Sequence, residues 1–293
     1  MYTQFFGSYL LRNNVVTREQ LLDAMSKCKT TRIKLGTIAI NRGLMTAAEV
    51  DECCFLQTRE DKRFGEIAME RGYLTWKQVE ELLGTQEPDY ILLGQTLVDS
   101  GALTNSDLER ALNDYQTVNE IDDLEDNIEN NDKIKTLIEN LLKESSAPVS
   151  EYVVMFLNLL FNDLIRFIGE DFTPLAPIIA DSHDCTIAVN QKIVGPVSFE
   201  TYADMNESAA IDFASRYAKE EFTEMDEYVE ASLEDFLNLH NGLYVVNMSN
   251  QNSIECSLEP PLNVSNQLIS IGNNGIIIPI IYPFGLVEII IGM

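Results

Sequence analysis

The first 116 residues of the chain contain one pattern four times. Each copy has a Gly that is followed ten residues later by a Thr, and the copies begin at an interval of 29 residues. A fixed interval of this length is typical of repeat proteins, in which each copy is one supersecondary unit and neighbouring units bury a shared core. The pairs are Gly7 and Thr17, Gly36 and Thr46, Gly65 and Thr75, and Gly94 and Thr104.

Each copy is predicted to form two short helices. Three copies have a second Gly (Gly43, Gly72 and Gly101), which suits the left-handed position that ends many helices. Each repeated Thr can cap the next helix, because an acid or Gln follows two to three residues later, as in a capping box. We therefore expect an all-α domain of four helical repeats over residues 1–116. Each Thr is also followed, four residues on, by an apolar residue: Leu21, Val50, Val79 and Leu108.

Acidic residues are concentrated in the second part of the chain. Residues 1–116 hold 13 Lys and Arg against 17 Asp and Glu, whereas residues 117–293 hold 7 against 30. Such a surplus repels nucleic acid and anionic membranes and favours a partner with a basic or metal-bearing face. Solubility alone is the other explanation. Within this part, residues 117–147 are predicted to be an acidic, helical linker between two domains.

Several protein classes are excluded at this stage. No apolar run reaches the length of about 18 residues that a membrane-spanning helix needs, so we expect no membrane insertion. The N-terminus lacks the basic start and cleavage site of a signal peptide. The five cysteines are odd in number and show no paired metal spacing. Reduced thiols in a cytoplasmic protein are the expectation.

Residues 148–293 have the pattern of an α+β domain. Helices are expected at 150–168 and 207–218, and a longer one is expected to start at a Thr223 cap and to run to about 247. Segments rich in β-branched residues and bounded by Gly or Pro predict the strands. These segments are 185–190, 194–202, 253–260, 275–283 and 285–293.

The long predicted helix carries polar residues on one side. Asp235, Asn238 and Gly242 share a stripe, and Asp235 and Asn238 lie about 60° apart on the helix. They flank a core stripe predicted at Val229, Ser232, Phe236, Leu239 and Leu243. The polar stripe is either solvated surface or a site that a partner can reach. Glu234 precedes Asn238 by four residues, so spacing does not decide which of the two acids would act with the Asn.

Other catalytic or metal-binding groupings are not predicted. The two histidines, His183 and His240, are far apart and lack the ligand spacing typical of zinc. No phosphate-binding loop, basic patch or Ser/His/Asp grouping is recognised, and no metal or other cofactor of the chain's own is expected.

Residues 150–293 resemble the CheX branch of the CheC/CheX/FliN family. The resemblance rests on the order of the predicted elements and on a signature of Glu-x-x-Asn, a Gly four residues later, and a Pro pair after the next strand. The matching positions here are Asp235, Asn238, Gly242 and Pro260/Pro261. The sequence departs from the family at Asp235, which is one methylene shorter than Glu, and at Ala231, where relatives often have Asp or Ser.

The resemblance implies that this domain dephosphorylates the aspartyl phosphate of a response regulator receiver domain, in which the receiver carries the Mg²⁺. Asn238 would orient the water, and Asp235 or Glu234 would dock on a receiver Lys. A non-catalytic receiver-binding adaptor and a structural part of a flagellar or pilus motor are the alternatives.

A homodimer through the C-terminal domain is a further expectation. CheX relatives commonly pair, and the two final apolar strands are predicted to be covered on both faces. An open edge of such a sheet would favour pairing with a second copy.

Residues 3–116 are similar to the N-terminal repeat domains of type II secretion and type IV pilus ATPases, the MshE N-terminal class. Relatives bind cyclic di-GMP through repeats that begin Arg-Leu-Gly and end in Gln. Arg63 is the one leading Arg that remains here, and Gln57 and Gln86 match the terminal Gln. Cyclic di-GMP binding at these three residues is therefore one hypothesis, and a plain helical interaction module is the other.

Overall fold

The structure is a computed structural model that describes residues 5–28, 31–84, 89–119, 135, 138–143 and 150–292. The chain divides into two compact units, Tyr2–Glu125 and Asp126–Met293. Most of the linker predicted at 117–147 lies outside the described residues, so its helical character and its boundaries stay predictions.

The regular elements that are described in the first unit are helices, grouped in consecutive pairs. Thr46 caps α4 with a complete capping box that includes Glu49, as the sequence predicts. Gly43, Gly72 and Gly101 all have positive φ, so they occupy the left-handed position after a helix that Gly favours. The helices are α1 (Phe6–Arg12), α2 (Arg18–Cys28), α3 (Leu35–Asn41), α4 (Ala47–Gln57), α5 (Phe64–Glu70), α6 (Trp76–Gly84), α7 (Asp89–Asp99) and α8 (Asn105–Asn119).

The first Gly of a repeat allows the two helices of that repeat to pack closely. A Cβ on Gly36 would lie 2.7 Å from Val50 Cγ1, and a Cβ on Gly94 would lie 2.7 Å from Leu108 Cδ1. Val50 and Leu108 are the apolar residues that recur after the repeated Thr. The repeated Gly and the repeated apolar residue are therefore the two sides of one helix–helix contact, which accounts for their constant spacing.

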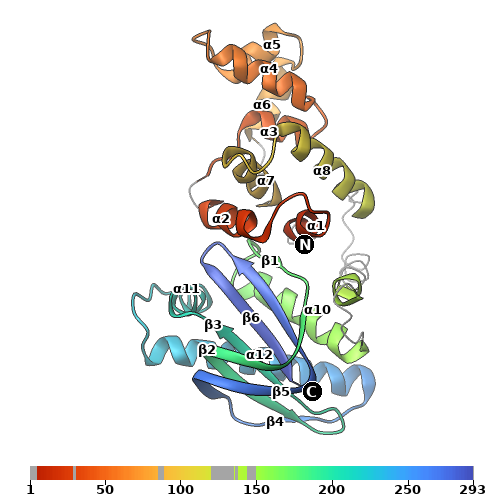
Figure 1. Cartoon of the computed structure of the whole chain (residues 1–293), viewed down its shortest axis with the longest axis vertical. Coiled ribbons are helices and arrows are strands. Elements are labelled where there is room, and N and C mark those ends of the chain that lie inside the picture. The colour runs from red at the N-terminus through yellow and green to blue at the C-terminus, as the bar shows by residue number, and fades with distance from the viewer. Residues whose placement is uncertain are drawn as a thin grey trace. The chain divides into compact units, whose positions relative to one another are not determined.

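The second unit combines helices with one antiparallel sheet, whose strands differ widely in length. The helices predicted at 150–168 and 207–218 are confirmed. The strands predicted at 185–190 and 275–283 are parts of longer strands, whereas the strand predicted at 253–260 is reduced to two residues. Its elements are α10 (Glu151–Phe167), β1 (Thr173–Pro174), β2 (Ile178–Val194), β3 (Phe199–Met205), α11 (Glu207–Ala218), α12 (Glu227–Asn252), β4 (Ser257–Leu258), β5 (Leu262–Tyr282) and β6 (Gly285–Gly292). Figure 1 shows the long strands crossing the unit, with helices packed along them.

Four of these strands form a closed antiparallel ring. The strand β2 pairs with both β3 and β5, and β6 pairs with both β3 and β5. The register of the β2–β5 pairing shifts between Ala180 and Ser182, and Gly272, in the part of β5 opposite this shift, has a φ of 81°. A Cβ on Gly275 would overlap the Ile271 side chain. These two glycines let the long strand β5 bend, so that its two halves can pair with different neighbours.

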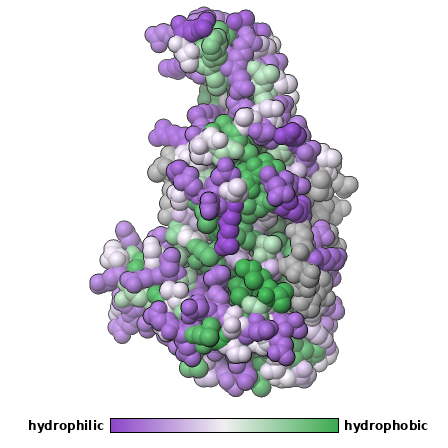
Figure 2. Space-filling view, in the orientation of Figure 1, coloured by the Kyte–Doolittle hydropathy of each residue, from purple (hydrophilic) through white to green (hydrophobic). Residues whose placement is uncertain are grey.

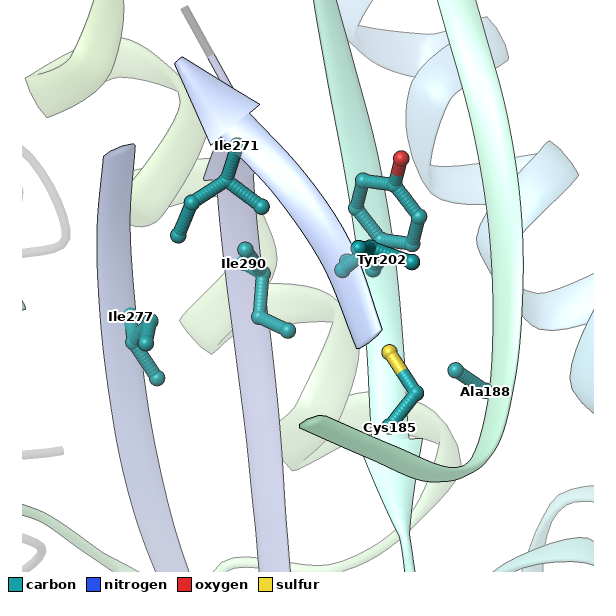
Figure 3. Packing of buried hydrophobic residues seen from close by; sticks show 7 residues of the cluster. Cys185, Ala188, Tyr202, Ile271, Ile277 and Ile290 are labelled. Carbon is teal, nitrogen blue, oxygen red and sulfur yellow. The ribbon is translucent and has the colours of Figure 1, made fainter. Parts of the chain in front are cut away.

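The interior of this ring is apolar. Figure 3 shows part of a cluster that includes Cys185, Tyr202, Ile277 and Ile290. The apolar strand predicted at 275–283 is buried from Ile276 through Tyr282, as expected for a strand covered on both faces.

The helix α12 crosses the outer face of the strands, and its ends differ from the prediction. Asp226 is the N-cap, since its Oδ1 accepts the N–H groups of Tyr228 and Val229. The predicted cap Thr223 is wrong because the chain turns into the helix three residues later. Leu243, which was assigned to the core stripe, is 41% exposed. The buried stripe instead comprises Val229, Leu233, Phe236, Leu237, His240, Asn241, Tyr244 and Met248.

Neither of the two apolar C-terminal strands is a free edge. The strand β6 lies between β3 and β5, and β5 has partners on both sides. The open-edge argument for a homodimer therefore does not apply to these strands, and dimerisation stays a prediction.

Among the described helices none is long and apolar enough to cross a membrane. Figure 2 shows hydrophobic areas set between hydrophilic ones on this face of the molecule.

We predict that Asp226→Ala lowers the free energy of unfolding by about 1 kcal/mol, because two N–H groups of the first turn of α12 lose their acceptor. Thr223→Ala is the matched control and should change stability by less than about 0.5 kcal/mol. Urea unfolding of both variants checks this, and a larger loss in Thr223→Ala would restore Thr223 as the cap.

Candidate functional site

The three predicted site residues lie on the outward side of α12. Asn238 and Asp235 are exposed, and Glu234 is half-buried. Each of the three side chains makes a hydrogen bond to a different element. The sequence spacing groups them on one stripe, but their partners in the structure differ. Asn238 contacts β2, Asp235 contacts α11, and Glu234 contacts β5.

Asn238 is held by a buried amide on the neighbouring strand. Gln191 of β2 is 1% exposed, and its Nε2 donates to Asn238 Oδ1 at 2.8 Å and to the main-chain oxygen of Glu259 at 2.9 Å. Both hydrogens of this NH₂ group are thereby used. A main-chain carbonyl can only accept, so the Gln191 atom that faces Glu259 has to be the nitrogen. This contact fixes the orientation of the whole amide.

A second buried amide closes the network from the helix side. Asn241 Nδ2 donates to Gln191 Oε1 at 2.9 Å and to Thr201 Oγ1 at 2.8 Å. The Thr201 hydroxyl in turn donates to the main-chain oxygen of Gln191 at 3.0 Å. Asn241 and Thr201 are both fully buried. The polar groups of α12, β2 and β3 are therefore joined across an otherwise apolar layer, and the rotation of α12 about its axis is fixed by these contacts.

The network also decides which end of the Asn238 amide faces outward. The nitrogen of Gln191 requires an acceptor, so Asn238 presents Oδ1 to it. Asn238 Nδ2 has no hydrogen-bond partner among the described residues and belongs to an exposed side chain. An NH₂ donor with a second lone pair on the adjacent oxygen can hydrogen-bond a water molecule and a neighbouring anionic oxygen together.

Asp235 is bound by a side chain of α11. The hydroxyl of Tyr217 on α11 donates to Asp235 Oδ2 at 2.6 Å. Partial burial and then this hydrogen bond to the carboxylate raise the pKa of Tyr217 well above its usual value, so the phenol stays protonated and keeps donating. The acid at the family position is thus partly engaged by its own chain.

Glu234 lies on the same side of the helix as the Asn238 contacts. Its Oε1 accepts from Asn263 Nδ2 at 2.6 Å. Asn263 stands opposite Val189 on β2, two residues before Gln191. Glu234 and Asn238, about 40° apart on the helix, therefore both bond toward the same end of the β2–β5 pair. Of the two acids that spacing left open, the contacts associate Glu234 with Asn238.

The surface around these residues is open. A Cβ on Gly242 would meet no described atom within 4 Å, so no helix of the described part packs against it. The adjacent segment carries Pro260 and Pro261 directly after Glu259, whose carbonyl anchors Gln191. An incoming surface can therefore approach α12 closely on the side of Asn238.

Sequence reasoning missed the residues that position Asn238. In β2 every second residue from Val189 to Ile193 is buried, and Gln191 is the polar residue among them. A polar residue at a position where the alternation predicts an apolar one is the sequence feature that could have indicated a buried hydrogen-bond network. Asn241 was not considered. His240, interpreted as a packed or surface residue, is fully buried, and its Nδ1 lies 2.8 Å from Asp163 Oδ2.

Two of the three residues proposed for cyclic di-GMP, Gln57 and Arg63, are among the described residues. Gln57 contributes to a mainly apolar cavity of about 270 Å³ with Gly36, Val50 and Phe64 among its lining residues. Arg63 is not among the residues that line it and is the N-cap of α5. Gln86 lies outside the described residues. Cyclic di-GMP binding stays a prediction that no contact here tests.

No protein-family model matches the chain, and no curated protein matches it. Several solved structures are similar to it, among them the following three. A CheC-like superfamily protein from Shewanella sp. PV-4 has 20% identity and a TM-score of 0.42, covering 48% of this chain and 95% of that one. CheX from Desulfovibrio desulfuricans has 14% identity and a TM-score of 0.43, covering 48% and 98%. The CheX-CheY-BeF3-Mg²⁺ complex from Borrelia burgdorferi has 21% identity and a TM-score of 0.43, covering 48% and 97%.

We predict that Gln191→Met lowers the free energy of unfolding by about 2 kcal/mol, because the buried Asn241 amide loses an acceptor and α12 loses its hydrogen bonds to β2. Asn263→Ala removes one exposed hydrogen bond and should cost less than about 0.5 kcal/mol. Equal midpoints for the two variants in urea unfolding, at unchanged slope, would show that the network is not a stabilising contact.

Proposed function

We propose that the C-terminal unit binds the phosphorylated receiver domain of a response regulator and hydrolyses its aspartyl phosphate. The observation that carries this proposal is the exposed Asn238 amide, whose Oδ1 is held by buried Gln191 and whose Nδ2 faces outward. The similarity of Asp235, Asn238, Gly242 and the pair Pro260/Pro261 to the CheX signature supports the same assignment.

Hydrolysis of the aspartyl phosphate requires few catalytic groups from the protein that binds the receiver. An aspartyl phosphate on a receiver lies beside the receiver's Mg²⁺, which already stabilises charge on the phosphoryl oxygens. What remains is to place a water molecule in line with phosphorus, since positioning and electrostatics supply most of the acceleration in phosphoryl transfer. Asn238 suits this task because its amide is neutral and its free Nδ2 and remaining Oδ1 lone pair can bind one water in a fixed direction.

A fixed direction requires that the Asn238 side chain does not rotate freely. The 2.8 Å hydrogen bond from Gln191 supplies that restraint, and Gln191 is itself restrained by Glu259 and Asn241. In this proposal Asn238 is the catalytic residue and Gln191 is a positioning residue that acts through it.

The docking anion in the proposal is Glu234. A receiver presents a Lys near its phosphorylation site, and a carboxylate beside Asn238 can pair with that Lys. Glu234 is half-buried and held by Asn263, which limits its rotamers before binding. Asp235 is directed toward Tyr217, so it serves the α11 side of the surface.

The adaptor alternative has one observation in its favour. The family's acid position is occupied by the shorter Asp235, and its carboxylate is bound by Tyr217. If that position is the one that has to meet the receiver, the surface recognises a receiver without hydrolysing its phosphate. Binding assays with a receiver carrying a stable phosphoryl mimic separate the two functions from each other.

We predict that Asn238→Ala lowers the rate of phosphate release from a phosphorylated receiver by about a hundredfold, the usual loss when one positioned polar group is removed. Asn250→Ala changes an exposed Asn of the same helix and should leave the rate unchanged. The assay is phosphate release from several phosphorylated receivers of the same source. A rate for Asn238→Ala equal to that of Asn250→Ala would exclude Asn238 as the water-positioning group.

We predict further that Glu234→Gln lowers kcat/KM by about tenfold or more through weaker docking, whereas Asp235→Asn lowers it by less than about threefold. The reason is that removing one partner of a docked charge pair typically costs about 2 kcal/mol or more. Steady-state kinetics with one receiver substrate compares the two variants. The reverse order would assign the docking role to Asp235.

A further inference from the structure

The ring of strands brings together side chains that can ligate a metal ion. His183 and Cys185 lie two residues apart on β2, and Asp204 is on β3. One donor atom from each of these three residues lies within 4.8 Å of the others. The sequence alone does not predict this grouping because the spacing around His183 is not typical of a zinc site, and Asp204 lies 21 residues further along the chain.

A fourth donor lies beside these three. Glu288 of β6 stands directly opposite Asp204 in the antiparallel β3–β6 pair, so both carboxylates project from one face of the sheet. His183 Nε2 lies 2.8 Å from Asp204 Oδ2 and 3.8 Å from Glu288 Oε2. Like charges directly opposite each other destabilise a strand pair.

The donors are largely shielded from water. Side-chain exposure is 12% for His183, 3% for Asp204 and 23% for Glu288, and Cys185 is 2% exposed. Figure 3 shows Cys185 within the apolar cluster inside the strand ring. The apolar surroundings of Cys185 thus form one side of the cluster, and Glu288 is its most exposed member.

The Asp204 carboxylate is already held in a fixed orientation by main-chain hydrogen bonds. Asp204 Oδ1 accepts the main-chain N–H groups of Thr186 and Ile187 at 2.9 and 3.1 Å. This leaves Oδ2 directed at His183. Hydrogen bonds that fix a ligating carboxylate in this manner are a regular feature of protein metal sites. The contact between His183 and Asp204 accounts for the imidazole and the carboxylate, and apolar packing accounts for the buried thiol. What points to a ligand is that a nitrogen, a sulfur and an oxygen donor lie within 4.8 Å of one another.

We propose that His183, Cys185, Asp204 and Glu288 form a binding site for a divalent transition-metal ion of the zinc type. One nitrogen, one sulfur and two oxygens match the ligand set that Zn²⁺ accepts in tetrahedral geometry. Ligand atoms in such a site are about 3.5 Å apart, so His183 Nε2 and Asp204 Oδ2, which lie 2.8 Å apart, separate slightly to admit the ion, and the Cys185 sulfur lies within 4.8 Å of the other two donors. The Cys185 thiol loses its proton to solvent when sulfur binds the metal. This site is separate from Asn238 and does not depend on the proposed phosphatase activity.

The test is a titration of the metal-stripped, reduced full chain with Co²⁺, followed by Zn²⁺. We expect one Co²⁺ per chain, a thiolate-to-cobalt charge-transfer band in the near ultraviolet, and loss of the band when Zn²⁺ displaces the cobalt. Cys185→Ser should abolish the band, and His183→Gln should weaken Co²⁺ binding at least tenfold. Cys256→Ser alters a half-buried Cys of the same unit outside the cluster and should behave as the wild type.

Thermal unfolding supplies a second readout that also reports whether each variant is folded. Zn²⁺ should raise the melting temperature of the wild type and of Cys256→Ser, because an ion that binds only the native state stabilises it. It should leave folded Cys185→Ser unchanged. Absence of the charge-transfer band in the wild type, or its persistence in Cys185→Ser, would overturn the site.

Discussion

The main-chain carbonyl of Glu259 determines the orientation of the Gln191 amide and, through it, of the Asn238 and Asn241 amides. It can only accept a hydrogen bond, so Gln191 has to present its nitrogen, and Asn238 then has to present its oxygen. A buried amide network is stabilising to the extent that its members are satisfied. Here both buried NH₂ groups have acceptors, while Asn241 Oδ1 has no hydrogen-bond partner among the described residues. The outward direction of Asn238 Nδ2 therefore follows from a contact on the opposite side of Gln191, and not from the surface on which Asn238 lies.

The closed ring of β2, β3, β5 and β6 gives this network a rigid base. Its inner face is filled by isoleucines and by Cys185 and Tyr202, and its outer face carries Gln191 and Thr201 toward α12. The outer face thus positions the polar groups of the proposed catalytic surface. The donors of the proposed metal site lie together on the same side of the strands as the apolar cluster. The two sites share strands β2 and β3 but no side chain.

The sequence predicted those parts of the fold that depend on neighbouring residues. The helices at α10 and α11, the buried run of β5 and the cap at Thr46 follow from local periodicity and capping chemistry. The same reasoning placed Asn238 at the edge of the core but chose Thr223 as a cap and Leu243 as core. It could not find the contact from Gln191 to Asn238, because these residues are 47 positions apart and only the tertiary packing brings them together. The choice between Glu234 and Asp235 likewise depended on partners from other elements, Asn263 and Tyr217.

The most direct test of this account is a double-mutant cycle on the rate of phosphate release from a phosphorylated receiver, with wild type, Gln191→Met, Asn238→Ala and the double variant. If Gln191 acts by holding Asn238, each single change slows release, and the double variant is no slower than Asn238→Ala, giving a coupling energy of about 1–3 kcal/mol. Independent, multiplicative losses would contradict the positioning role of Gln191. Equal rates for all four proteins would contradict the catalytic role of Asn238.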